Sequence, residues 1–293
     1  MLTCYSQVSV TLSELFPDPV DGHPKPDSAA DDKPRLRSLS VVLPAFNEQY
    51  NLRRTVEAAR RILPKVASQW EIIIVNDGSR DATGRICDTL VAQIPRVRAV
   101  HHCGNKGYGA ALKSGIMAAR YDWIFFSDSD GQFDFAEISR LLDHAGENDI
   151  VAGFRKHRND PFYRALNARG WNILARVSLG VAVRDIDCAF KLFRRRVFEQ
   201  VQIRSVGAMV NTEILCQAFK FGMRIKEVEV THYPREHGQP SGAKPRVIVK
   251  AFRELFRMWR KLRTISHEQE GLYPRGAGSI GEVSIVPDQL DNG

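Results

Sequence analysis

The sequence contains no long uncharged apolar run. A helix that spans a bilayer needs roughly 18 or more consecutive apolar residues, and none of the apolar stretches here approaches that length. The N-terminus also lacks a basic segment followed by an apolar one, which is the pattern of a secretion signal. We therefore expect a cytoplasmic protein that neither spans a membrane nor is secreted.

Cysteine is scarce as well, with five residues in a chain of 293. The five are scattered and odd in number, and they show neither a C-x-x-C pair nor the Cys/His spacing of a zinc site. This pattern argues against a disulfide framework of the kind found in small secreted domains. We expect all five to be reduced thiols.

Acidic residues are in the minority, with 34 Asp and Glu against 42 Lys and Arg. The excess of +8 lies in the middle of the chain, because residues 1–37 carry a net −2 and residues 264–293 a net −4. Residues 38–263 therefore carry +14. Such a charge indicates an anionic partner, and nucleotide phosphates, anionic lipid head groups and nucleic acid would each satisfy it.

The most informative stretch is D-W-I-F-F-S-D-S-D-G-Q, residues 122–132, in which a short apolar strand stops at Asp128 and Asp130. Residues i and i+2 of a strand point to the same side, so both carboxylates can face one hard cation. Mg²⁺ is usually held by one or two carboxylates together with waters and substrate phosphates. The alternative is a polar turn in which Gly131 supplies a positive φ.

Polar loops also follow three other predicted strands, residues 38–43, 70–75 and 97–101. After the second strand, Asp77 either forms a turn or accepts hydrogen bonds from the ribose or base of a nucleotide. After the third strand, the glycines of H-C-G-N-K-G-Y-G open a helix. We expect backbone N–H groups at this helix N-terminus to approach a diphosphate, with Lys106 and Lys113 adding positive charge.

Strands and helices alternate along the first half of the chain, up to a strand at residues 149–153. The helix that follows residue 83 is predicted to face inward with Ile86, Leu90, Val91 and Ile94, and residues 133–143 are predicted to form one helix. The alternation of strands and helices predicts an α/β fold with a parallel or mostly parallel sheet and helices on both faces. Ligands bind to such sheets at the carboxyl ends of the strands. The second half predicts helices at 161–179 and before Gly222, a strand at 224–231, and a basic amphipathic helix at 246–263.

Four motifs, P-A-F-N-E (44–48), V-N-D-G-S-R-D-A-T (75–83), N-K-G-Y-G-A-A-L (105–112) and D-S-D-G-Q (128–132), together resemble the family 2 inverting glycosyltransferases. Within that family the chain is most similar to the polyprenyl- and dolichyl-phosphate sugar synthases of the mannose type. The resemblance covers residues 38–263 and implies a single Rossmann-like GT-A domain. Residues 1–37, which are rich in Pro, Asp and Ser without apolar periodicity, and residues 264–293 are predicted to be disordered tails. The resemblance also implies transfer of a sugar from a GDP- or UDP-sugar, with Mg²⁺ or Mn²⁺ on the diphosphate.

The resemblance further implies three groups of site residues. The nucleotide-sugar group comprises Pro44, Ala45, Asn47, Glu48, Asp77, Asn105, Lys106, Gly107, Lys113, Ser129, Asp130 and Arg235. The metal group comprises Asp128, Asp130 and Gln132, and the catalytic group comprises Asp185, Asp187 and Arg155. The chain departs from the family pattern at Asn76, where an aspartate is usual, at Ala189, where a glycine is usual, and in a longer loop after Arg235.

The acceptor decides what the catalytic group must do. A hydroxyl acceptor needs a general base such as Asp185. A lipid phosphate is already anionic and needs little base, so Arg155, Arg164 and the helix 246–263 become acceptor contacts. The alternative for Asp185 and its neighbour Asp187 is an ion pair with Arg184 or Arg194.

The helix 246–263 has two interpretations of its own. It either packs on the domain with its basic face in water, or lies in an anionic membrane interface and gives peripheral membrane contact. A non-catalytic module that binds membranes or nucleic acid would use the positive charge but would not need Asp128 and Asp130.

A nucleotidyltransferase would carry a Gly-rich basic loop after the first strand, where this chain has P-A-F-N-E. We therefore predict an enzyme with a polyprenyl-phosphate acceptor. A soluble saccharide or protein acceptor is the alternative, and no nucleic-acid partner is expected.

Overall fold

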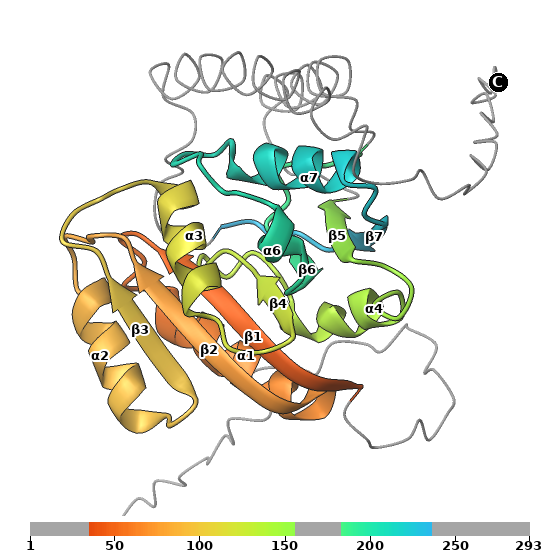
Figure 1. Ribbon diagram of the computed structural model, residues 1–293. Helices are drawn as coiled ribbons and strands as arrows, with labels where there is room; N and C mark the ends of the chain where they lie inside the picture. Colours follow the sequence, from red (N-terminus) through yellow and green to blue (C-terminus); the bar gives the residue numbers. More distant parts are fainter. Residues whose placement is uncertain (1–34, 156–182, 236–293) are drawn as a thin grey trace, which may run out of the picture. The chain divides into compact units, whose positions relative to one another are not determined.

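A seven-stranded sheet organises the computed structural model, which describes residues 35–155 and 183–235 (Figure 1). The strand order is β3-β2-β1-β4-β6-β5-β7, and only β6 runs antiparallel to its neighbours. The strands are β1 (Leu36–Ala45), β2 (Ala67–Asn76), β3 (Val97–His101), β4 (Trp123–Phe126), β5 (Ile150–Arg155), β6 (Lys191–Arg194) and β7 (Ile225–Val230). The predicted mostly parallel sheet is confirmed.

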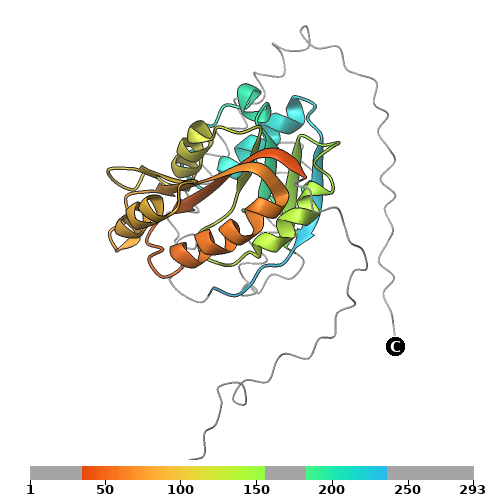
Figure 2. The same cartoon turned by 90° about the horizontal axis from the view of Figure 1, so that it is seen from below.

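The helices are α1 (Leu52–Val66), α2 (Thr83–Gln93), α3 (Tyr108–Ala118), α4 (Ile138–Leu142), α6 (Val197–Gln200) and α7 (Val210–Lys220), with a 3-10 turn η2 (Phe135–Glu137). Figures 1 and 2 show α1 and α2 on one face of the sheet and α3 and α7 on the other. The chain steps from β1 to β2 to β3 and then returns to place β4 beside β1 on its other side. Right-handed crossovers therefore put α3 on the opposite face, as predicted.

The two central strands are longer than predicted. β1 begins at Leu36 and not at Ser38, because parallel pairing with β2 continues from Leu36, opposite Ala67, to Ala45, opposite Asn76. Nearly every residue of β1 is buried, as expected for a strand covered on both faces. The strand order reverses between β1 and β4, and this is where open α/β sheets bind their ligands.

Two helix predictions need correction. In α2 the buried residues are Thr83, Cys87 and Leu90, whereas Val91, predicted to face inward, is 37% exposed. The helix begins at Thr83, and the hydrogen bond from the Glu48 backbone N–H to the Thr83 hydroxyl turns that side inward. The single helix predicted after Gln132 is instead η2 followed by the short α4.

The end of α7 agrees with the prediction, since Gly222 follows it with a φ of 71°. In the described ranges, no helix is long and apolar enough to cross a membrane. The predicted helices at 161–179 and 246–263 lie outside the described residues, as do residues 1–34 and 264–293 of the predicted tails.

Candidate active site

The two carboxylates of D-S-D lie just beyond the end of β4, next to the end of β1. Between them, Ser129 is 2% exposed, and its hydroxyl donates to the carbonyl oxygen of Pro44 over 2.7 Å. The Ser129 carbonyl in turn accepts from the Thr55 hydroxyl over 3.1 Å. Ser129 therefore anchors the loop to the inside of the domain, while Asp128 and Asp130 lie close enough to repel each other.

The electrostatics of this pair suit a cation. Burial, followed by the charge of Asp130, raises the pKa of Asp128 to about 7. Burial also raises the pKa of Asp130, against the lowering influence of Arg235. No cluster of three or more Asp, Glu, His or Cys occurs in the part of the chain that the structure describes. Two hard oxygen ligands without a full cage fit a divalent cation that shares its coordination with phosphate oxygens.

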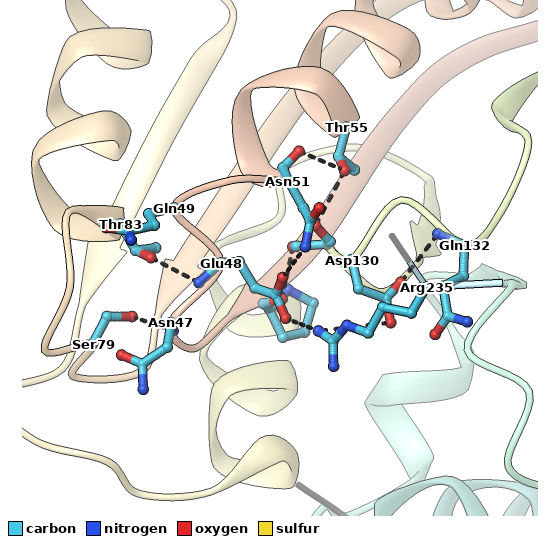
Figure 3. Close-up of polar contacts among 12 residues, drawn as sticks. Asn47, Glu48, Gln49, Asn51, Thr55, Ser79, Thr83, Asp130, Gln132 and Arg235 are labelled. Atoms are coloured by element: carbon cyan, nitrogen blue, oxygen red, sulfur yellow. Dashed lines mark hydrogen bonds and ion pairs between the residues drawn. The ribbon is translucent and has the colours of Figure 1, made fainter. Parts of the chain in front are cut away.

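Residues following β7 close one side of this site (Figure 3). Arg235 contacts the Glu48 carboxylate and lies 4.0 Å from Asp130. The backbone N–H of Tyr233 donates to the Gln132 carbonyl over 2.8 Å, and the Gln132 side-chain amide donates back to the Tyr233 carbonyl over 2.8 Å. The structure thus brings together Glu48, Asp130, Gln132 and Arg235, which the sequence placed 187 residues apart at the extremes.

The loop after β1 is tied to the loop after β2. Asn47, with a φ of 58°, donates its N–H to the Ser79 hydroxyl over 3.0 Å, and its side-chain oxygen accepts from the Arg80 N–H over 2.8 Å (Figure 3). The Ala45 carbonyl accepts from the Asp77 N–H over 2.9 Å. Burial raises the pKa of Glu48, while its hydrogen bond from Asn51 opposes that shift.

A cleft of about 570 Å³ lies at the carboxyl ends of β1, β2 and β3. Its lining comprises Phe46, Asn47, Asn76, Gly78, Ser79, Arg80, His101, His102, Cys103, Gly104 and Asn105. The volume lies within the range of small-molecule sites, and the lining offers amide, hydroxyl and imidazole groups. Of the predicted nucleotide-sugar residues, Asn47 and Asn105 line this cleft.

Asp77 lies behind the wall of the cleft and holds it in place. Its carboxylate accepts hydrogen bonds from the backbone N–H groups of Lys106 and Gly107, over 2.9 and 2.8 Å. It also pairs with His102 Nδ1 at 2.6 Å, and His102 Nε2 lies 2.9 Å from the Ser114 hydroxyl. Asp77 thus organises the loop that carries Asn105, and direct contact between Asp77 and a nucleoside stays a prediction.

Backbone N–H groups at the glycine-rich start of α3 bind another part of the chain. The N–H groups of Gly109 and Ala110 donate to the Val206 carbonyl, over 3.0 and 3.3 Å. A Cβ on Gly107 would lie 2.3 Å from that same oxygen. In this structure the close approach that the glycines permit is to the chain's own backbone, and contact between the helix N-terminus and a diphosphate stays a prediction.

Residues 204–207, which lie against the start of α3, are bound in turn by a side chain of α7. The Glu213 carboxylate accepts from the backbone N–H groups of Arg204 and Ser205, over 2.9 and 2.7 Å. Lys113 is exposed and lines a second cavity of about 540 Å³, bounded by α3, α6 and residues 201–204, which shares no lining residue with the first. Lys113 therefore does not line the cleft that Asn47 and Asn105 line, and its contact with a nucleotide sugar stays a prediction.

The predicted catalytic group contains a buried ion pair. Arg155 donates to both carboxylate oxygens of Asp185, over 2.7 and 2.9 Å, and the two side chains are 13% and 5% exposed. The sequence suggested Arg184 or Arg194 as the ion-pair partner, whereas in the structure Asp185 pairs with Arg155. Asp187 is exposed. The charge of Arg155 also acts on Asp128, since it lowers the pKa of that carboxyl group.

Two buried polar side chains near the site were missed by sequence reasoning. Lys191 is completely buried, donates to the carbonyls of Ile186 and Cys188, and has its pKa lowered by that burial. Its position inside the otherwise apolar run A-F-K-L-F, residues 189–193, is the sequence feature that indicates a buried lysine. Tyr108 carries a buried hydroxyl beside Asp128, and no local pattern distinguished it from a core aromatic residue.

Comparison with known proteins places the chain in a family. The model of "Glycosyl transferase family 2" matches residues 40–202. Glycosyltransferase AglD of Haloferax volcanii is 34% identical over 67% of this chain and 33% of its own length. Polyprenol monophosphomannose synthase of Mycolicibacterium smegmatis is 32% identical over 70% of this chain and 81% of its own length. Dolichyl-phosphate beta-glucosyltransferase of Dictyostelium discoideum is 32% identical, over 66% and 65%.

The match therefore spans a third of the first relative and slightly under two thirds of the last. Among solved structures, glucosyl-3-phosphoglycerate synthase of Mycobacterium tuberculosis in complex with UDP has a TM-score of 0.59 at 20% identity, over 76% of this chain and 80% of that chain. This likeness supports the GT-A fold. Because the family model covers more than half of the chain and the mannose synthase matches along most of its length, the chain belongs to glycosyl transferase family 2.

Proposed function

We propose that this protein is a metal-dependent, inverting glycosyltransferase that moves a sugar from a GDP- or UDP-sugar to a polyprenyl phosphate. The observation that carries the proposal is the position of Asp128 and Asp130 at the end of β4, beside the cleft at the ends of β1, β2 and β3. A nucleoside in the cleft directs its diphosphate toward the two carboxylates. The names of several relatives specify polyprenyl-type phosphate acceptors.

In this proposal the donor is held by groups from four strand ends. Asp128, Asp130 and the Gln132 side chain would hold Mg²⁺ or Mn²⁺, and that cation would offset the charge that develops on the diphosphate leaving group. Arg235 supplies a second positive charge beside Asp130. Asp77 acts through the loop it anchors, and Asn47 and Asn105 face the nucleoside.

The acceptor follows from the chemistry of the catalytic group. Both oxygens of Asp185 accept hydrogen bonds from Arg155, and a carboxylate so engaged is better suited to orienting a guanidinium than to removing a proton. A phosphate acceptor is already anionic and requires no base. Arg155 then contributes positive charge on the acceptor side, and peripheral membrane contact through residues 246–263 belongs to the same proposal.

The test is sugar transfer by the purified protein with Mn²⁺ or Mg²⁺, across labelled GDP- and UDP-sugars, with and without a short polyprenyl phosphate. Asp130→Asn removes a proposed metal ligand. Asp134→Asn is the matched control, because Asp134 is exposed, lies in the next turn and caps η2. We expect metal-dependent label in the lipid fraction from the wild type and from Asp134→Asn, but not from Asp130→Asn.

Each of the other outcomes would overturn a different part of the proposal. Label that appears only in water-soluble products or on protein would overturn the lipid acceptor and retain the glycosyltransferase. Failure to bind any nucleotide would overturn the enzyme. Equal activity of Asp130→Asn and the wild type would overturn the metal role of the D-S-D pair.

A further inference from the structure

Glu213 is a buried carboxylate of α7 that the proposed mechanism does not use. One of its oxygens, Oε2, accepts hydrogen bonds from the backbone N–H groups of Arg204 and Ser205, over 2.9 and 2.7 Å. Hydrogen bonds to a charged acceptor are stronger than those between neutral groups. A carboxylate that binds two successive N–H groups therefore fixes the backbone at residues 204 and 205.

The next residue of the chain connects this contact to α3. The Val206 carbonyl accepts hydrogen bonds from the N–H groups of Gly109 and Ala110, over 3.0 and 3.3 Å. A Cβ on Gly109 would lie 2.4 Å from the Ser205 carbonyl oxygen, so the two backbones meet without room for a side chain. Because the contact is this close, a shift of residues 204–207 would also displace the start of α3.

The start of α3 continues directly from one wall of the nucleotide cleft. Residues 104 and 105 line the cleft, and the backbone N–H groups of residues 106 and 107 donate to the Asp77 carboxylate. The loop and the helix start are therefore held at two points, Asp77 and the Val206 carbonyl. Asp77 holds the first point directly, whereas the second depends on what fixes residues 204–207.

Gln217 offers a natural comparison, because it lies one turn further along α7 and is also buried. Its side-chain amide donates to the Gln202 carbonyl and accepts from the Gln202 N–H, both over 3.0 Å. Like Glu213, Gln217 thus makes two hydrogen bonds to the backbone before α7. Its contact point lies four residues before Val206, whereas that of Glu213 lies immediately before it.

We propose that Glu213 is a positioning residue for nucleotide binding, which holds residues 204–207 against α3 and thereby fixes the wall of the nucleotide cleft at residues 104 and 105. The inference rests on the proposed function, because the cleft must receive the nucleoside. Glu213 itself lines neither of the two cavities and makes no contact with the donor in this proposal. Nucleotide affinity then depends on a side chain of α7 that acts through the backbone.

The test measures binding of GDP, UDP and their sugars by isothermal titration calorimetry with Mn²⁺, for the wild type, Glu213→Ala and Gln217→Ala. Urea unfolding of each variant reports its stability. We expect the Kd of the nucleotide that the wild type binds to rise about 5-fold or more in Glu213→Ala, which is the lower end of typical coupling between two sites. In Gln217→Ala it should change by less than about 2-fold.

Two further variants test the same contact. Glu213→Gln keeps a side-chain oxygen that can accept from both N–H groups, and we expect its Kd to lie closer to that of the wild type than the Kd of Glu213→Ala does. Gly109→Ala forces the contact open from the side of α3, so its Kd should rise as in Glu213→Ala. If Glu213→Ala does not fold, Gly109→Ala and Glu213→Gln decide the question.

Each contrary result has a separate meaning. Absence of nucleotide binding by the wild type would overturn the proposed function and this inference with it. Nucleotide binding by the wild type, with equal Kd values for Glu213→Ala and Gln217→Ala, would overturn the role of Glu213 alone. An affinity lost for the nucleotide sugar but not for GDP or UDP would also overturn that role, because Glu213 would then contact the sugar.

Discussion

Replacement of Gly107 by alanine tests whether the start of α3 is built around the Val206 carbonyl. Gly107 has a φ of 102° and a ψ of 158°, a combination that is essentially restricted to glycine. A Cβ added there would lie 2.3 Å from the Val206 oxygen, far inside van der Waals contact. Since that oxygen is also the acceptor for the N–H groups of Gly109 and Ala110, moving it away weakens both hydrogen bonds.

The magnitude follows from these two terms. Holding a non-glycine residue in such a conformation costs about 1–3 kcal/mol, and each weakened hydrogen bond adds about 0.5–1.5 kcal/mol. A central value is about 4 kcal/mol of lost stability. For a domain of this size, each kcal/mol lowers Tm by about 2–4 °C, so the expected decrease is about 8–16 °C.

Thermal unfolding followed by circular dichroism measures the effect. Gly104→Ala is the matched control, because Gly104 lies in the same loop, has an ordinary φ, and would place its Cβ in open space. We expect the control to unfold within about 2 °C of the wild type. Equal Tm values for the two variants would refute the close approach between the start of α3 and the segment 205–207.

Two further predictions concern buried charges. Asp185→Asn leaves the Arg155 guanidinium without its partner and should lower the free energy of unfolding by about 3–5 kcal/mol. The exposed control Glu147→Gln should change it by less than about 0.5 kcal/mol. Similar values for the two variants in urea unfolding would contradict the buried pair. Because burial lowers the pKa of Lys191 from 10.5, the unfolded chain holds that proton more tightly, and stability rises with pH between the folded and unfolded pKa values. The stability of the wild type relative to Lys191→Met should therefore increase toward about pH 10, by at most about 1.4 kcal/mol per pH unit, and a flat difference would show that Lys191 titrates normally.

Much of the fold could be predicted from the sequence, because the patterns that mark strands and helix ends involve only neighbouring residues. β3 occupies the predicted residues 97–101, and Gly222 ends α7, since strand periodicity and a positive φ depend on neighbouring residues only. The carboxylates of the D-S-D motif were placed at a strand end for the same reason. The predicted inward face of α2 was wrong, because a hydrogen bond from the Glu48 backbone N–H to the Thr83 hydroxyl sets the rotation of the helix.

The sequence by itself determined the order of the strands and helices, the edge of the sheet that carries the site, and the identity of the two carboxylates. Tertiary structure alone decided which partner each polar group takes. The Val206 carbonyl binds the start of α3 although Val206 lies 97 residues after Gly109 in the chain. Arg155 forms an ion pair with Asp185, and Tyr108 lies beside Asp128. Hydrogen bonds and ion pairs between distant residues depend on how the helices pack on the sheet, and no periodicity or spacing in the sequence encodes that packing.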